Sequence, residues 1–187
     1  MKREGRTIWF LICLMCSVDL IAAQPPGRNS RMEPRVFSLG YQENDPFEDA
    51  KAPTNVMLDV LLRTPEVRMN SGGLRGLNRE NLRKLFRIVQ IHLAETDEID
   101  WLVNGRFPMT GADCEWFWIV QTVRGNTKVI LFANTNSLEL LAKSTNGLND
   151  VRTVWSSAAG YALTDIYHFD GAVYRRIHAF TKTDKLP

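Results

Sequence analysis

The feature that most constrains the fold of this chain is a change of hydrophobic period, which becomes two from about residue 88 onward. Apolar and polar residues alternate in short runs such as IVQIHLA, IDWLVNG, WFWIVQTV, KVILFA and VRTVWSS, and turn-forming bends separate these runs. Alternation places every second side chain on one face of a strand, and bends between such runs indicate hairpins. We therefore expect an α+β, β-rich domain in which N-terminal helices pack on an antiparallel meander sheet.

Two segments before the strands carry helical patterns. The first follows a capping residue at Thr54 or Asn55 and stops before Pro65. The second, residues 78–90, begins at the cap Asn78 and places four apolar side chains at positions i, i+3, i+4 and i+7 of one helical face. These four residues are Leu82, Leu85, Phe86 and Val89.

The segment DIYHFDGAVYRR, residues 165–176, predicts a closing hairpin with Asp170-Gly171 as a two-residue type I′ turn. The expected pairs are Phe169–Ala172, Tyr167–Tyr174, Asp165–Arg176, Leu163–His178 and Tyr161–Phe180. All of these side chains would share one face, because side chains alternate along a strand. The aromatic content of that face favours a place in the core. The Asp165–Arg176 pair favours an exposed recognition face, because burying an ion pair is costly.

The first 23 residues read as a signal peptide. A basic start precedes an apolar run that is shorter than a bilayer span, and Ala22-Ala23 offers a small-residue cleavage site. An uncleaved membrane anchor is the alternative. Residues 24–53 hold five of the eight prolines and predict a flexible leader, or a short binding peptide around Phe37 and Tyr41. A single globular domain is then expected over residues 54–183.

Removing residues 1–23 leaves 20 Lys and Arg against 19 Asp and Glu, a net charge near +1. This balance argues against a nucleic-acid-binding protein, which normally carries a basic stripe. Cys114 would be the single cysteine of the mature chain, so an intramolecular disulfide is excluded and an intermolecular one stays open. We expect Cys114 to be a half-buried structural residue.

The order of motifs over residues 86–177 resembles small bacterial exported proteins with FG-GAP- or VCBS-like segments. An apolar strand leads into an acidic bend, and GADCEWFW, NSLELL, STNGLNDV and YHFDGAVYRR follow in that order. The resemblance implies a β-rich domain with blade-like strand pairs that serves as a binding or structural module, often with bound calcium. In that family a strand ends in a loop of the form Asp-x-Asp-Gly-x-x-Asp/Glu.

The two loops that would hold calcium depart from this pattern. The first bend lacks both glycines, and the second lacks the leading aspartates. Calcium needs six to eight oxygen ligands from a tight loop, so we interpret both bends as vestigial turns. The candidate metal ligands are Asp97, Glu98, Asp100, Asn146 and Asp150.

No arrangement in the sequence predicts an enzyme. His92, His168 and His178 have no metal-ligand spacing, no nucleophile elbow occurs, and Glu115 beside Trp116 is a single carboxylate rather than a pair. Trp116 and Trp118 fall on one strand face with Phe117 opposite. They predict either core packing or a platform for a sugar ring or peptide.

The sequence thus predicts an exported, periplasmic or extracellular, non-enzymatic binding or structural module without a cofactor. Its ligand would contact an aromatic sheet face, and its partner would be a protein, peptide or glycan at the cell envelope. The candidate ligand-binding residues are Trp116, Trp118, Tyr167, Tyr174 and Arg176. A cell-envelope hydrolase or hydrolase inhibitor is the alternative function.

Overall fold

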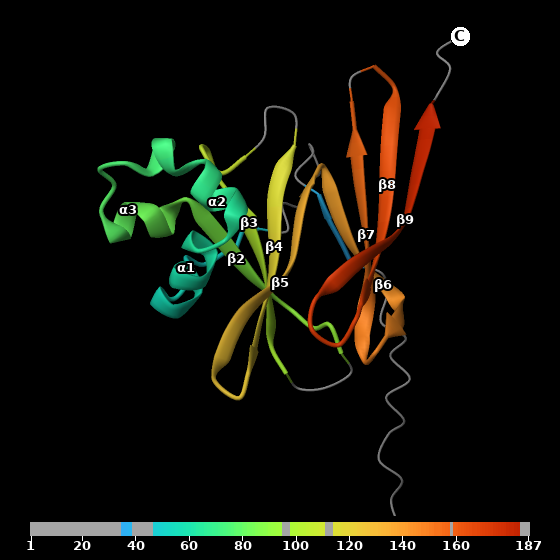
Figure 1. The fold of residues 1–187 in the computed structure, drawn as a ribbon, viewed down its shortest axis with the longest axis horizontal. Coiled ribbons are helices and arrows are strands. Elements are labelled where there is room, and N and C mark those ends of the chain that lie inside the picture. Colours follow the sequence, from blue (N-terminus) through green and yellow to red (C-terminus); the bar gives the residue numbers. More distant parts are fainter. Residues whose placement is uncertain (1–34, 39–46, 95–97, 111–113, 158, 184–187) are drawn as a thin grey trace, which may run out of the picture. The chain divides into compact units, whose positions relative to one another are not determined.

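In a computed structural model, the described residues form nine strands in two antiparallel sheets and a small group of helices (Figure 1). The structure describes residues 35–38, 47–94, 98–110, 114–157 and 159–183. The predicted signal peptide, residues 1–23, lies outside the described residues. In the described part of the chain, no helix combines the length and apolar character that crossing a membrane requires. The expected β-rich, antiparallel character is confirmed.

The strands form two sheets where the sequence predicted one. The central sheet has the order β2-β3-β4-β5, and the terminal sheet has the order β1-β6-β7-β8-β9. The chain passes from the first sheet to the second at Asn136, which alone separates β5 from β6. The Asn136 side chain oxygen accepts a hydrogen bond from the Ser156 N–H at 2.5 Å, and this contact fixes the corner.

The bounds of the elements follow the chain. The central sheet contains β2 (Phe86–Ile91), β3 (Asp100–Gly105), β4 (Glu115–Val123) and β5 (Asn126–Thr135). The terminal sheet contains β1 (Arg35–Ser38), β6 (Ser137–Thr145), β7 (Leu148–Ser156), β8 (Tyr161–Phe169) and β9 (Tyr174–Thr183). The helices are α1 (Asn55–Leu62), α2 (Pro65–Met69), the 3-10 helix η1 (Ser71–Leu74) and α3 (Arg79–Lys84).

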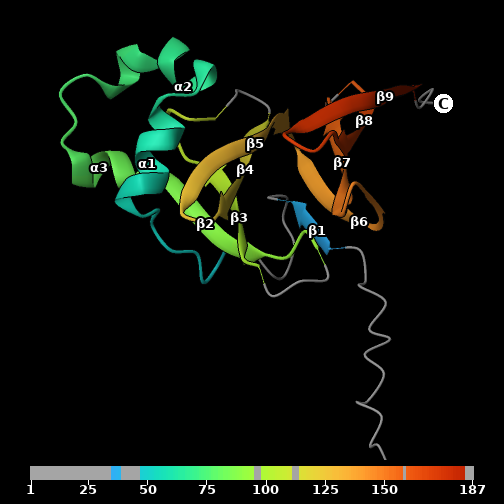
Figure 2. The ribbon, with the colours of Figure 1, turned by 60° about the horizontal axis from the view of Figure 1, so that its bottom comes forward.

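The central sheet is covered on both faces, which Figure 2 shows from a second direction. On β4 the consecutive residues Phe117 and Trp118 are both fully buried but belong to different clusters. Trp118 packs with Phe86 of β2 and with Leu58 and Leu61 of α1. Phe117 packs toward the terminal sheet. Strand alternation thus distributes neighbouring residues of one strand between two separate cores.

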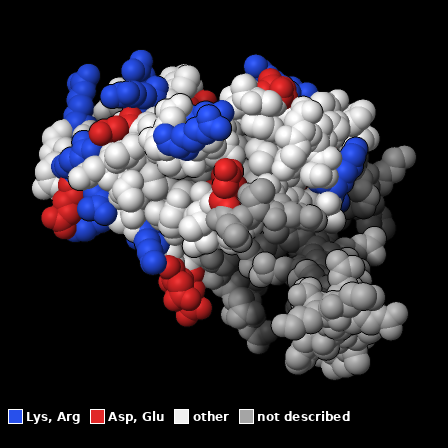
Figure 3. Space-filling model, turned by 90° about the horizontal axis from the view of Figure 1, so that it is seen from below, with Lys and Arg blue, Asp and Glu red and all other residues white. Residues whose placement is uncertain are grey.

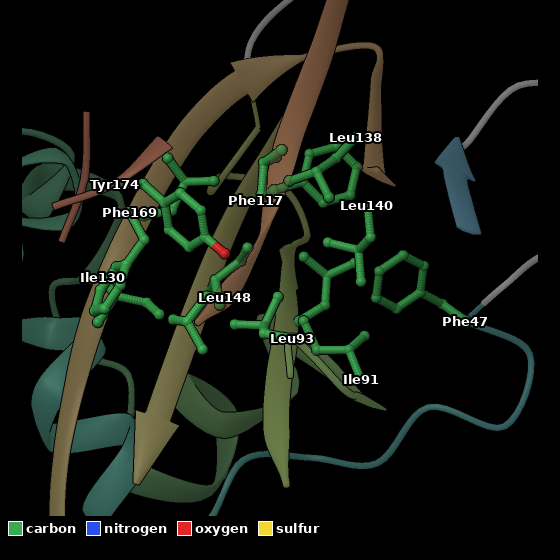
Figure 4. Packing of buried hydrophobic residues seen from close by; sticks show 14 residues of the cluster. Phe47, Ile91, Leu93, Phe117, Ile130, Leu138, Leu140, Leu148, Phe169 and Tyr174 are labelled. Atoms are coloured by element: carbon green, nitrogen blue, oxygen red, sulfur yellow. The ribbon is translucent and has the colours of Figure 1, made fainter. Parts of the chain in front are cut away.

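The core between the two sheets contains leucine and aromatic side chains from both sheets and isoleucine side chains from the central sheet (Figure 4). Leu102 and Ile119 come from the central sheet, and Leu138 and Val151 come from the terminal sheet. A β-bulge in β5 pairs Ile119 with Leu131 and Val120 with Val129. Ile130 is therefore an extra residue, and it joins Leu131 in this same core.

Both helix caps follow the predicted positions. The Thr54 hydroxyl accepts from the Met57 N–H at 3.3 Å, and the Asn78 side chain accepts from the Asn81 N–H at 2.9 Å. The predicted extent of the second helix is wrong, because α3 ends at Lys84 and β2 begins at Phe86. Residues 86–91 instead pair with β3, which satisfies their backbone groups while Phe86 and Ile88 still pack against the helices.

Part of the predicted leader, residues 24–53, belongs to the fold. Strand β1 pairs with β6 at the edge of the terminal sheet, with Phe37 opposite Leu138. Phe47 is buried in the core between the sheets. Lys51 exchanges two backbone hydrogen bonds with Ile88, at 3.0 and 2.8 Å. The domain therefore begins before residue 54, because these backbone and apolar contacts offset the low periodicity of the segment.

Candidate functional site

The β8–β9 hairpin forms the end of the terminal sheet, and a loop of four residues, Asp170 to Val173, closes it. The Asp170 carboxylate accepts hydrogen bonds from the Val173 and Ala172 N–H groups, both at 2.8 Å, and from Arg175 Nε at 2.9 Å. The Val173 N–H, then the Arg175 side chain and the Ala172 N–H, lower the pKa of Asp170 to about 2. The ionised carboxylate therefore organises this loop.

This loop shifts the predicted pairing. Phe169 lies opposite Tyr174 rather than Ala172, and Tyr167 lies opposite Arg176 rather than Tyr174. The predicted two-residue type I′ turn is thus wrong. Asp170 satisfies two backbone N–H groups of a longer loop, so a tight turn is not needed there.

A second departure lies further along the hairpin, where β9 contains a β-bulge. Tyr167 pairs with Arg176 but Ile166 pairs with His178, so Ile177 is an extra residue. Opposed residues share a face, and Ile166 lies on the face away from the central sheet. His178 and Phe180 are therefore on this outer face, whereas the predicted register placed them on the inner face with Tyr167.

The inner face of the hairpin begins in the core. The rings of Phe169 and Tyr174 lie 5.6 Å apart at an interplanar angle of 56°, and both side chains are buried. The Tyr174 hydroxyl donates a 2.6 Å hydrogen bond to the carbonyl of Asn149 in β7. Burial, and then the charges of Asp100 and Asp150, raise the pKa of Tyr174. Tyr174 is thus a neutral structural link between β9 and β7.

Further along the inner face, Asp165 lies buried between two predicted ligand-binding residues. Its Oδ2 is 3.6 Å from Arg176 Nη1 and 3.5 Å from the Tyr167 hydroxyl. Its Oδ1 is buried and has no hydrogen-bond partner within the described residues. Burial, followed by the Asp165 charge, raises the pKa of Tyr167. The expected Asp165–Arg176 ion pair is therefore present, although it arises from a different register.

On the outer face a second buried carboxylate, that of Asp150, lies beneath the side chains of His168 and Lys143. Asp150 Oδ2 is 3.2 Å from His168 Nε2 and 3.9 Å from Lys143 Nζ. The His168 contact has the distance of an ion pair but not the alignment of a hydrogen bond, so both carboxylate oxygens lack a hydrogen-bond partner among the described residues. The pairing of β7 with β8 brings this acid and this histidine together.

The outer face also carries exposed apolar and aromatic side chains toward the end of β9. His178 and Phe180 stack, with ring centroids 5.7 Å apart and planes inclined by 26°. Phe180 is 56% exposed and Ile177 is 41% exposed. Within the described residues β9 pairs with β8 alone, so its other edge carries no partner strand there. We call Ile177, His178 and Phe180, with the outer edge of β9, the β9 edge surface.

The two tryptophans of the predicted set lie on the other side of the molecule's central sheet. Trp116 and Trp118 share the helix-side face of β4, as expected, with ring centroids 5.9 Å apart. Trp118 is fully buried, and Trp116 is half-buried edge-on against Phe132 at 5.6 Å. Burial leaves Trp118 no ring face for a ligand, and the same holds for Tyr174. Of the predicted set, Arg176 is exposed and Tyr167 is half-buried.

The candidate metal ligands occupy several different environments. Asp97 lies outside the described residues. Glu98 is exposed, whereas Asp100 and Asp150 are buried. Asn146 occupies the β6–β7 turn, and its side-chain amide donates to the Phe169 carbonyl at 2.7 Å. In the described ranges, no group of three or more His, Cys, Asp and Glu residues is arranged to hold a metal ion.

Asp100 is instead part of the connection between the sheets. Its carboxylate accepts from the Leu93 N–H at 3.3 Å, and the Leu93 carbonyl accepts from the Asn149 N–H at 2.6 Å. Burial raises the pKa of Asp100, and its hydrogen bonds with Leu93 and Gln121 oppose that rise. The role that the contacts support is structural.

The Asp150–His168 contact and the outer position of His178 were not predicted from the sequence. The β7–β8 register could have revealed the first, because pairing Arg152 with Ile166 places Asp150 opposite His168. No glycine or proline marks the bulge at Ile177, so the second had no sequence signal. Comparison with known proteins adds nothing further, since no family model, curated protein or solved structure matches the chain significantly.

Proposed function

We propose that this chain is an exported, non-enzymatic binding module that holds an extended peptide along the β9 edge surface. The observation that carries the proposal is the last strand of the terminal sheet, where every residue from Arg175 to Thr181 is exposed and one edge has no partner strand in the described structure. Proteins usually protect such an edge by shortening, charging or covering it.

Among the described residues, no segment covers the half of β9 from Ile177 to Thr181, and this half is neither short nor charged. It contains no Lys, Arg, Asp or Glu, and it includes the apolar Ile177 and Phe180. A peptide that pairs with this edge would satisfy its backbone groups, about 4.8 Å away. Alternate side chains of the peptide would then meet the His178–Phe180 stack on the outer face.

The first half of β9 is less suited to bind a peptide, so the proposed site would end where this half begins. Arg175 is joined to Asp170 and Arg176 is joined to Asp165, so these cations are already paired. The helices pack on the other face of the central sheet, and in the described part of the chain no helix covers the outer face of the terminal sheet. The resemblance to FG-GAP- and VCBS-like modules remains a hypothesis that is compatible with such a role.

The proposal can be tested by selecting short random peptides on the immobilised full chain and locating their site by hydrogen exchange. We expect selected peptides to protect β9 amides. Ile177→Asp places a charge on the edge and should weaken their binding by about tenfold or more. Val56→Asp alters another exposed apolar residue, which lies on α1, and should leave binding unchanged.

Two outcomes would contradict the proposal. Selected peptides could protect amides outside β8 and β9, or they could bind Ile177→Asp and wild type with equal affinity. Circular dichroism melting of each variant would establish that a loss of affinity is not a loss of fold.

A further inference from the structure

A close contact brings two distant segments together at the edge of the helical layer. Gly73 in η1 packs against Pro108, which follows β3, so tightly that a Cβ at Gly73 would lie 3.0 Å from Pro108 Cγ. Figure 1 shows α2 beside the end of β3 from which this loop continues. Met69 is four residues before Gly73 and Phe107 is next to Pro108, so this contact brings the chain segments that carry the two side chains close together.

These two side chains are the most exposed large apolar residues of the described chain. Phe107 is 85% exposed and Met69 is 79% exposed. Each is held by a fully buried neighbour two residues away, Met109 for Phe107 and Val67 for Met69, and both neighbours belong to the helix-side core. The protruding side chains thus stand on anchored backbone, and water solvates them at a free-energy cost.

Three arginines flank the two apolar side chains. Arg68 precedes Met69, Arg75 follows η1 and Arg106 precedes Phe107, and all three are exposed. Within the described residues no ion pair joins any of them to a carboxylate. Glu66 in α2 is the described acid closest to them in sequence. We call Met69, Phe107 and these three arginines the arginine-apolar patch.

The distribution of charge supports a local basic surface. Residues 55–87 contain seven Lys and Arg and three Asp and Glu, a net charge of +4. Asp59 and Glu80 already pair with Arg79 and Lys84. Figure 3 shows Lys and Arg side chains gathered at the left, over the helices. Because charges are screened over about 10 Å at 0.1 M salt, this local excess matters more than the near-neutral whole chain.

We propose that the arginine-apolar patch docks the protein on a membrane surface of anionic phospholipid. Protruding Phe and Met side chains can enter the boundary between headgroups and acyl chains, and arginines around them attract anionic headgroups. An acidic protein could attract the same arginines but would not require two fully protruding apolar side chains. A membrane of anionic phospholipid interacts favourably with both the protruding apolar side chains and the arginines.

The test places an environment-sensitive fluorophore at the patch of the full-length chain. Cys13, Cys16 and Cys114 are replaced by Ser, and Phe107→Cys is labelled with NBD. The matched control carries the label at Phe180→Cys, on the outer face of the terminal sheet. Both proteins are titrated with vesicles of phosphatidylcholine alone and of phosphatidylcholine with phosphatidylglycerol.

With the anionic vesicles only, we expect the emission of the probe at position 107 to shift to shorter wavelength. The same probe should then be shielded from an aqueous quencher. The probe at position 180 should stay in water. Replacing Arg68, Arg75 and Arg106 by Gln should raise the half-saturating lipid concentration about a hundredfold, or roughly fivefold for each arginine. Replacing Arg124, Arg152 and Arg175 by Gln removes the same charge elsewhere and should change it much less.

Three results would overturn the proposal. The first is no lipid-dependent shift at position 107, or an equal shift with phosphatidylcholine alone. The second is an equal shift at position 180, or an equal effect of the two triple substitutions. The third is a shift produced by polyglutamate but not by vesicles, which would assign the patch to an acidic protein partner. Melting curves of all variants control for folding.

Discussion

Two hairpins of the terminal sheet, β6–β7 and β8–β9, carry closely related turn sequences but close in different ways. Between β6 and β7, Asn146-Gly147 forms a two-residue turn with positive φ at both positions, 50° and 85°, and Thr145 pairs with Leu148. Between β8 and β9, Asp170-Gly171 forms part of a four-residue loop, and Phe169 pairs with Tyr174. A dipeptide signal therefore locates a turn without fixing its length.

The side chains at the two turns explain the difference. Asn146 is a donor, and its amide reaches the Phe169 carbonyl of the neighbouring hairpin. Asp170 is an acceptor, and its carboxylate accepts hydrogen bonds from the Ala172 and Val173 N–H groups and from the Arg175 side chain. A charged acceptor of this kind stabilises a loop that offers it several donors. The following predictions test this comparison, from the largest expected effect to the smallest.

Removing the aromatic ring beside the longer loop should have the largest effect. Phe169 is buried in the core between the sheets, so Phe169→Ala should lower the free energy of unfolding by about 3–5 kcal/mol. Leu148→Ala, beside the shorter turn, removes fewer atoms and should cost less. Urea denaturation measures both. A loss below about 1 kcal/mol for Phe169→Ala would show that the Phe169–Tyr174 pair does not anchor the hairpin.

The hydroxyl that links the two hairpins should have an intermediate effect. Tyr174→Phe deprives the buried Asn149 carbonyl of its 2.6 Å donor and should cost about 1–3 kcal/mol. Since burial raises the pKa of Tyr174 in the folded protein, its contribution is complete below the unfolded pKa of about 10 and declines above it. As pH rises above about 9, the free energy of unfolding should therefore fall more steeply for wild type than for Tyr174→Phe.

Alkaline denaturation curves would show this difference, with the exposed Tyr161→Phe as the control. Parallel curves for wild type and Tyr174→Phe would contradict it.

The shorter turn should depend on both the backbone and the amide of Asn146. Asn146→Ala loses the bond to Phe169 and places an ordinary residue at φ 50°, so we expect a cost of about 1–2 kcal/mol. Asn146→Gly keeps the positive φ and loses only the hydrogen bond, so it should cost less. Equal losses of stability for the two variants, measured by thermal melting, would show that the positive φ of Asn146 does not contribute to the cost.

The smallest effect, and one that depends on pH, is expected at the exposed Asp170. Its pKa of about 2 lies below the unfolded value of about 3.9, so the ionised form stabilises the fold. This stabilisation is present above about pH 4 and disappears as pH falls through about 2. Asp170→Asn should therefore be less stable than wild type at pH 7 and equally stable near pH 2. A difference that does not change with pH would exclude the carboxylate as its cause.

The sequence predicted local features better than pairing. Thr54 and Asn78 were recognised as helix caps because capping depends on one side chain and the following turn. The pattern Leu82, Leu85, Phe86 and Val89 also fits a helix, but the backbone of residues 86–91 gains a partner in β3. In such a short segment, pairing with a neighbouring strand overrides a helical pattern formed by only four apolar residues.

The candidate site shows the same limit. The Asp165–Arg176 contact was foreseen, because hairpin geometry brings the two residues close in either register. The outer position of His178 and Phe180 was not foreseen, since one extra residue, Ile177, reverses the faces of all that follow it. Packing decides where such a bulge forms, and a single sequence does not display it.

The separation of Phe117 and Trp118 into two cores gives this protein an internal optical reporter. Three of its five tryptophans, Trp101, Trp116 and Trp118, contribute to the helix-side core, while the core between the sheets contains none in the described structure. Indole emission should therefore follow the loosening of the helical layer, and far-ultraviolet dichroism should follow the strands. If the two signals change at different denaturant concentrations, the helices and the pair of sheets are separate cooperative units.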